Sequence, residues 1–242
     1  MRGLLLVVIL GVIGLDAHPA WGETVSQKRE RATLQRLTQQ FSVAYGHNRY
    51  VEAEKIAREA MHRAESAFGA QDPEVAKALD SIALALEAQG RHEELEPLLK
   101  QALEIRQTAY GPNHTEVAKS LSNLAGLYSF EGRYLEAEAL YQQALDIYET
   151  IAGLHDVLVA NALYDLASAY RSDGKSIQAE PLLRRAVTIR HELVGRNSPM
   201  LLHLLDAYAA VLKDVGQTQK AAAIESQVEF IRQKRDQALK TR

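Results

Sequence analysis

The chain has 242 residues and a formal net charge of −3, and Ala, Leu, Glu, Gln and Arg are abundant in it. This length accommodates one or two domains, the composition favours helix over sheet, and the charge gives no reason to expect a nucleic-acid partner. Because the sequence contains no cysteine, it excludes disulfides, thiolate catalysis and cysteine-based metal sites.

Residues 1–22 have the pattern of a signal peptide. Arg2 supplies a positive charge, apolar residues and glycines run without a break from Leu4 to Leu15, and the small residues Ala20 and Gly22 suit cleavage after Gly22. The alternative is an uncleaved membrane anchor, but a spanning helix needs about 20 apolar residues and this run has 12. We therefore expect an exported bacterial protein, periplasmic or secreted, with no stable membrane span after cleavage.

A step of 42 residues recurs in several columns of the sequence. Glycine holds one column, and valine and isoleucine hold two others: Gly90, Gly132, Gly174 and Gly216; Val75, Val117 and Val159; Ile105, Ile147, Ile189 and Ile231. Such a fixed period is typical of stacked repeats that share one continuous core. If the repeat units are counted from Val75, residues 33–242 form one solenoid of five units: 33–74, 75–116, 117–158, 159–200 and 201–242. A polar lead-in at residues 23–32 precedes it.

The unit 117–158 shows that each repeat is a pair of helices. Apolar residues recur at i, i+3, i+4 and i+7 in its first half, as on one face of an amphipathic helix, at Leu121, Leu124, Ala125 and Tyr128. Gly132 can adopt the left-handed conformation that ends a helix and starts a tight turn, and a second apolar stripe follows it. Asp72 and Ser198, each followed by a proline, pair an N-cap side chain with proline at the first helical position, and His114 and Asp156 occupy the matching place in the other two linkers.

These features resemble the tetratricopeptide repeat. The helix–turn–helix order, the turn glycine and the small residues of the second helix carry the resemblance, and the stretch from Ala102 to Tyr128 is similar to the repeats of kinesin light chain and of many bacterial proteins. The minimal unit of that family has about 34 residues, whereas each unit here has 42. The resemblance implies an all-α fold, a right-handed α-solenoid of stacked antiparallel helix pairs, whose concave face is lined by the first helix of each unit.

The same resemblance implies that first-helix side chains outside the packing columns line a protein-binding groove. The candidates are Lys77, Asp80, Lys119, Ser122, Asn123, Phe130, Asn161, Tyr164, Asp165, Arg171, His203 and Asp206. In kinesin-light-chain-like repeats, paired asparagines of the first helix hydrogen-bond the backbone of a bound peptide. Asn123 keeps that column here, whereas Ser81, Asp165 and Ala207 occupy it in other units. The alternative is that these side chains form a solvated helix face.

Phe130 falls just before the turn of its unit, on the expected groove side. An exposed aromatic side chain there would anchor a partner, and a core or dimer contact is the alternative. Two basic clusters, at 28–36 and 232–242, are interleaved with acidic residues. Such clusters fit solubilising end caps, and a patch for phosphate or lipid headgroups is the alternative.

Nothing in the sequence predicts catalysis, a cofactor or a metal. The eight histidines form no HxxxH or HxH pair, and we find no Ser-His-Asp order or glycine-rich phosphate loop. The sequence therefore predicts a non-catalytic protein–protein interaction scaffold of the bacterial envelope, which binds a peptide or helix of a partner protein in its concave groove. The alternative is a structural solenoid that self-associates into a homo-oligomer and has no groove ligand.

Overall fold

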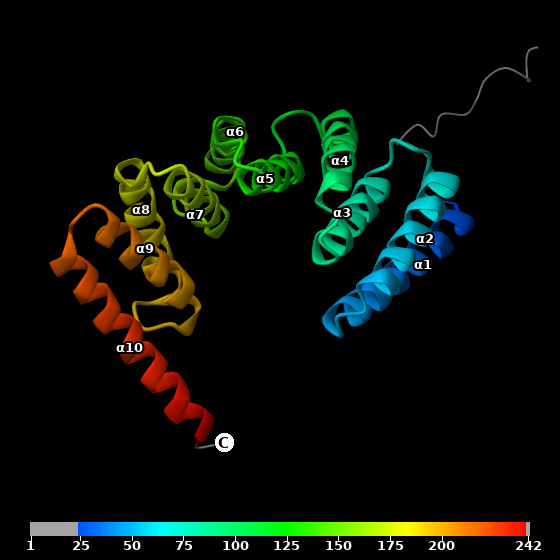
Figure 1. Cartoon of the computed structure of the whole chain (residues 1–242). Helices are drawn as coiled ribbons and strands as arrows, with labels where there is room; N and C mark the ends of the chain where they lie inside the picture. Colours follow the sequence, from blue (N-terminus) through cyan, green and yellow to red (C-terminus); the bar gives the residue numbers. More distant parts are fainter. Residues whose placement is uncertain (1–23, 241–242) are drawn as a thin grey trace, which may run out of the picture.

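A computed structural model describes residues 24–240, except the side chains of residues 238 and 240, so the expected signal peptide lies outside the described residues. The described part folds as α-helices joined by short turns (Figure 1). The helices are α1 (Val25–Gly46), α2 (Tyr50–Phe68), α3 (Pro73–Ala88), α4 (Leu95–Tyr110), α5 (Thr115–Phe130), α6 (Tyr134–Ala152), α7 (Val157–Ser172), α8 (Ser176–Val194), α9 (Leu202–Asp214) and α10 (Thr218–Lys240). Short 3-10 turns at His92–Glu94 and Pro199–Leu201 precede α4 and α9.

The helices form an open arc of antiparallel pairs, each packed chiefly on its neighbours in sequence. In Figure 1, α3, α5 and α7 lie on the inner side of this arc, and α4 and α6 lie on its outer side. The predicted all-α solenoid of stacked helix pairs is therefore confirmed. Its first helices face the hollow of the arc.

The ends of the helices follow from the residues that recur at each step. Gly132 has a φ of 77°, and after it Arg133 N–H donates to the carbonyl of Tyr128 at 2.8 Å, which closes the turn between α5 and α6. Asp156 starts α7 as an N-cap, since its carboxylate accepts the Leu158 N–H at 2.7 Å. His114 does the same for α5, where its Nδ1 accepts the Glu116 N–H at 3.2 Å.

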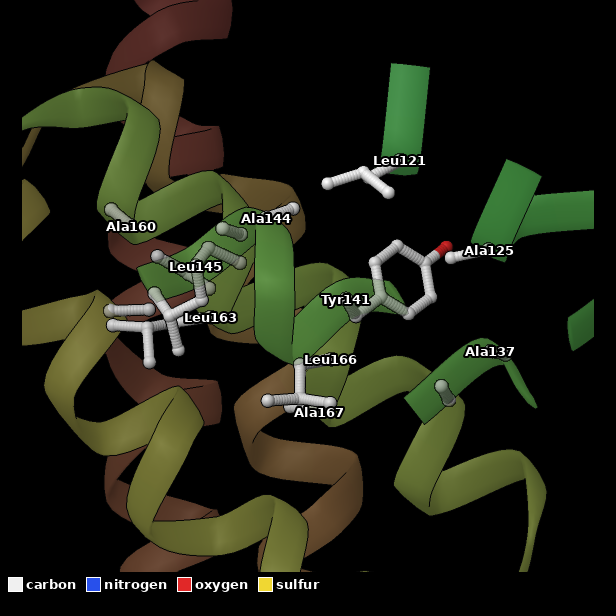
Figure 2. Close-up of a cluster of buried hydrophobic side chains, with 14 of the residues drawn as sticks. Leu121, Ala125, Ala137, Tyr141, Ala144, Leu145, Ala160, Leu163, Leu166 and Ala167 are labelled. Atoms are coloured by element: carbon white, nitrogen blue, oxygen red, sulfur yellow. The ribbon is translucent and has the colours of Figure 1, made fainter. Parts of the chain in front are cut away.

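Alanines at fixed positions let the two helices of a pair approach closely. Ala137 and Ala144 of α6 are fully buried, so they leave room for the leucines of the neighbouring helices. Figure 2 shows this junction, in which Tyr141 reaches from α6 toward Ala125 of α5 while Leu163 packs beside Leu145. The apolar columns found in the sequence form two buried clusters, a large one that runs from α1 to α10 and a smaller one of α1 to α4 that contains Val75 and Ile105.

The first helix begins earlier than the sequence pattern indicates. Residues 25–32, expected to be part of a polar lead-in, belong to α1. A capping box fixes this start: Thr24 Oγ1 accepts the Gln27 N–H at 3.1 Å, and Gln27 Oε1 accepts the Thr24 N–H at 3.0 Å. The first buried residue of α1 is Leu34, so this first turn has no apolar stripe by which periodicity could have revealed it.

Candidate functional site

The inner face of the arc is hollowed between α3 and α5. The backbones of α5 and α7 contact each other, as do those of α7 and α9, whereas α3 and α5 approach less closely. A cavity of about 560 Å³ opens there, which we call the inner groove. Its lining comes from α3 to α7: Asp80, Ser81, Ala83, Leu84, Glu87, His92, Leu95, Leu99, Lys119, Ser122, Asn123, Gly126, Leu127, Phe130, Tyr141 and Asp165.

A buried arginine lies beneath this opening. Arg106 of α4 is only 1% exposed. Its Nη2 lies 2.6 Å from Asp80 Oδ2 on α3, and its Nη1 donates to Ser120 Oγ on α5 at 2.6 Å. A buried charge is tolerated only when it is paired and hydrogen-bonded. Arg106 therefore connects α3 to α5 and compensates the charge of Asp80.

Half of the residues predicted for a protein-binding groove line the inner groove. They are Asp80, Lys119, Ser122, Asn123, Phe130 and Asp165. Lys77 lies beside it, in a hollow of about 270 Å³ between α1 and α3 that Lys119 also borders. The first helices thus bring the predicted residues of the second and third units together.

Except for Asp165, the predicted residues of the last two units lie apart from this site. Tyr164 and Arg171 line another hollow of about 350 Å³ between α7 and α9. Arg171 already pairs with Asp214 at 2.7 Å, and this hydrogen bond lowers the pKa of Asp214. The remaining three, Asn161, His203 and Asp206, line none of these three hollows.

His203 and Asp206 contact residues of the protein itself. The His203 ring lies against the Tyr164 ring, with 4.3 Å between the centroids. Asp206 pairs with Arg232 at 2.8 Å, a contact that repeats the Asp80–Arg106 pair three units further along the chain. Two aspartates predicted to face a ligand are therefore bound by arginines of their own units.

Asp165 differs from these paired aspartates. It projects from α7 into the inner groove, and burial raises its pKa to about 6. Within residues 24–240 no hydrogen bond or ion pair reaches its carboxylate. The groove thus contains a carboxylate that is partly removed from water and has no compensating charge.

Tyr141 also contributes to the groove, although its column is a packing column. Its ring is buried and its hydroxyl lies 3.4 Å from the point where a Cβ would stand on Gly126. Burial and the negative charge of Asp165 raise the pKa of this hydroxyl. Gly126 occupies the column in which other units have Leu84, Ser168 and Ala210. Because glycine has no side chain, it leaves the Tyr141 hydroxyl uncovered, and this glycine is the sequence feature that could have indicated the contribution of Tyr141 to the groove.

Apolar side chains form the rim. Phe130 is 68% exposed and Leu84 is 40% exposed. The Phe130 ring lies against the His92 ring, with 4.4 Å between the centroids. We did not predict Leu84 or His92, because Leu84 has the apolar character of a core residue and His92 lies outside the first helices.

The inner groove offers a ligand apolar contacts and the carboxylates of Asp165 and Glu87. Within the described part of the chain, no three His, Asp or Glu side chains lie close enough together to hold a metal ion. Among residues 24–240, no helix is both long enough and apolar enough to cross a membrane.

Comparison with known proteins identifies the repeats. Two models of the tetratricopeptide repeat match the chain, one over residues 42–74 and the other over 74–150 and 158–234. A search of curated proteins finds no significant match.

Solved structures share the fold. The crystal structure of BtubC (BKLC) from P. vanneervenii is 25% identical, covers 87% of this chain and 90% of its own, and has a TM-score of 0.74. A Podosopora anserina structure of nearly identical TPR-like repeats of the kinesin light chain type is 24% identical, with coverage of 83% and 97% and a TM-score of 0.68. The Rap conjugation gene regulator of plasmid pLS20, in complex with the Phr* peptide, is 17% identical, with coverage of 91% and 60% and a TM-score of 0.65. The chain belongs to the tetratricopeptide repeat family, whose members serve as protein-interaction scaffolds.

Proposed function

We propose that this protein is a non-catalytic scaffold that binds an extended segment or a helix of a partner protein in the inner groove. The observation that carries the proposal is the cavity of about 560 Å³ on the inner face, with Phe130 exposed at its rim. Exposed aromatic side chains beside a pocket are the usual anchors of protein interfaces. Pockets that bind small ligands have volumes of roughly 300–1,000 Å³, so this cavity is large enough to take a few side chains of a bound segment.

The fold is compatible with this role. The Rap regulator, which has the same fold, was solved in complex with a peptide. In the present chain the groove is lined mainly by first helices, which are rigid elements held by the core. A partner segment would therefore meet a surface that is already formed, which lowers the entropic cost of binding.

A photo-crosslinking experiment in the native cell tests the proposal. The crosslinking residue p-benzoylphenylalanine would replace Leu84 in the groove, or Ile177 of α8, which is an exposed apolar residue outside it. We expect a discrete partner adduct from position 84 and a much weaker one from position 177. Adding Phe130→Ser should reduce the adduct from position 84, whereas adding Leu135→Ser, an equally exposed change on α6, should not.

The alternative is self-association, and exposed apolar residues on second helices favour it. Leu135 and Ile177 occupy the same column of adjacent units and are both exposed. If crosslinks from position 177 join two copies of this chain, and none from position 84 captures another protein, the groove proposal is wrong and the structural alternative stands.

We also propose that the protein acts in the bacterial envelope after export. The proposal rests on the charged start, the apolar run Leu4–Leu15 and the small residues before position 23. Sequencing the N-terminus of the protein purified from its own cells tests it. A chain that starts at residue 23 in the envelope fraction supports export, and one that starts at Met1 in the cytoplasm contradicts it.

A further inference from the structure

We infer that the inner groove selects a partner segment by one basic side chain, a lysine or an arginine, which pairs with Asp165. The inference rests on the proposed groove binding and adds the chemistry by which the partner is recognised. It also predicts that an apolar or aromatic residue close to the basic one packs against Phe130.

The first argument is that Asp165 lacks a partner. Within the described residues neither a cation nor a hydrogen-bond donor reaches its carboxylate, and burial alone accounts for its raised pKa. Other aspartates of the inner face are paired, Asp80 with Arg106 and Asp206 with Arg232. A partly buried carboxylate destabilises the free protein unless a charge compensates it, so a cation from outside would remove that cost.

The second argument is that the position is specific to one unit. In the column of Asp165 the other units carry Gln39, Ser81, Asn123 and Ala207, none of which is charged. A charge needed by the repeat fold itself would be expected in more than one unit. The carboxylate therefore belongs to the surface of this particular groove.

The third argument is that the groove offers a second hydrogen-bonding group. The hydroxyl of Tyr141 borders the same cavity, and no hydrogen bond joins it to a residue between 24 and 240. An ammonium has three N–H donors and a guanidinium has five. Either group could therefore donate to the carboxylate of Asp165 and to the hydroxyl of Tyr141 together.

The balance of charge limits the fit to one basic side chain. Glu87 of α3 adds a second acidic group with no hydrogen bond or ion pair among the described residues, which favours a cation. Lys119 borders both the inner groove and the hollow beside it, and it would repel a second cation. A polybasic stretch therefore fits less well than a single lysine or arginine next to apolar residues, which can lie against Leu84 and Phe130.

A selection from a phage library of random nonapeptides tests the inference without knowledge of the natural partner. The bait is residues 23–242, either with the natural sequence or with Asp165→Asn. With the natural sequence, we expect selected peptides to share a lysine or arginine at a fixed distance from an apolar or aromatic residue. With Asp165→Asn, the enrichment of the basic residue should be lost while that of the apolar residue remains.

Binding of one selected peptide then measures the pair directly. Asp165→Asn should weaken binding by about 10- to 100-fold, as expected for the loss of a charge-assisted hydrogen bond. Replacing the basic residue of the peptide with norleucine should weaken it to a similar degree, and the two changes together should cost little more than either alone. Asp206→Asn, on the same face but outside the groove, is the matched control and should leave binding unchanged.

Each outcome decides between the two proposals. Peptides that bind the groove and are displaced by Phe130→Ser, but lack a common basic residue, would overturn this inference and leave the proposed function intact. Basic enrichment that survives Asp165→Asn would also overturn it. A library that yields no peptide dependent on the groove would contradict both.

Discussion

Glu96 of α4 accepts a hydrogen bond from Arg133, which follows the turn glycine of the next unit, with 3.0 Å between Oε2 and Nη1. The same contact recurs one unit before and one unit after: Arg91 Nη1 lies 2.7 Å from Glu54 Oε2, and Lys175 Nζ lies 3.3 Å from Glu138 Oε2. Each junction between these units therefore has an acid on a second helix and a base at the following turn.

The last junction lacks its base. Gln217 occupies the column of Arg91, Arg133 and Lys175, and its Oε1 is buried without a hydrogen-bond partner among the described residues. The expected acid is present as Glu180. We predict that Gln217→Arg stabilises the last unit by about 1 kcal/mol, because it forms a charge-assisted hydrogen bond and removes an unpaired carbonyl oxygen.

Hydrogen exchange of the α9 and α10 amides measures this effect, because the end unit of a repeat array can open on its own. Exchange in α10 should slow in Gln217→Arg. Gln219→Arg adds the same charge at an exposed position two residues away and should leave exchange unchanged. Equal slowing in both variants would show that net charge, and not the junction, is responsible.

The junction at Glu96 predicts a dependence of stability on pH. Hydrogen bonds from Lys100, Tyr128 and Arg133 lower the pKa of Glu96 to about 2, from an ordinary 4.5. Since the pKa is lower in the folded state, the stabilisation is fully present above pH 4.5 and is lost as the pH falls toward 2. Glu96→Gln should thus be less stable than the natural protein at pH 7, and roughly half of this difference should remain near pH 3. Urea midpoints at pH 7, 5, 4 and 3 measure it, and a difference that does not change with pH would contradict the prediction.

Asp165 has the opposite dependence. Burial raises its pKa from 3.8 to about 6, so the folded state holds the proton more tightly and stability falls as the pH rises between these values. We predict that Asp165→Asn is more stable than the natural protein by about 1–3 kcal/mol at pH 7.5. The gain should disappear near pH 4, where both proteins carry a neutral side chain. Thermal melts at the two pH values measure it, and a variant less stable at pH 7.5 would reveal a partner for the carboxylate.

Arg106 and Arg232 occupy the same column but differ in burial. Arg106 is 1% exposed and Arg232 is 46% exposed, although each pairs with an aspartate of its own unit. Arg106→Ala should cost about 3–5 kcal/mol, because it leaves Asp80 without its cation and opens a cavity. Arg232→Ala should cost less than about 1 kcal/mol, as exposed pairs do. Urea denaturation of the two variants measures both, and equal costs would argue against the connecting role of Arg106.

Gly126 offers a test of the groove that does not require the partner. It lies inside α5, where alanine stabilises a helix by roughly 0.5–1 kcal/mol relative to glycine. A Cβ there would meet only the Tyr141 hydroxyl, at 3.4 Å. Gly126→Ala should thus raise the melting temperature while it narrows the groove and weakens the binding of selected nonapeptides. Unchanged affinity would place the bound segment away from Tyr141.

The fold could be predicted from the sequence because its determinants are local and repeated. Gly132, the buried alanines Ala137 and Ala144, and the cap Asp156 each act on their own helix or the adjacent turn. The 42-residue step shows that the same pair of helices is built again. The start of α1 could not be predicted in this way. It depends on Thr24 and Gln27, which lie outside the repeated columns.

The site was predictable only in part, because it depends on how two units lie relative to each other. The expectation that first-helix side chains outside the packing columns line the groove identified Asp165 and Phe130, which do line the inner groove. The same expectation could not show that Asp80 is paired and Asp165 is not, because the partner of Asp80 is Arg106 of a second helix, α4. The periodicity also places Tyr141 on the apolar stripe of a second helix, which does not show that its hydroxyl borders the cavity.

The connection made by Arg106 bears on the shape of the whole molecule. In a solenoid each unit contacts only its neighbours, so the curvature of the array is the sum of the rotations at its junctions. A small rotation between α3 and α5 would move the distant helix α10 by a larger amount, because the displacement grows with the distance from the joint. Arg106 holds that joint by three polar contacts, to Asp80 of α3 and to Ser120 and Glu116 of α5. A segment bound in the groove beside it would therefore be able to set the distance between the two ends of the arc.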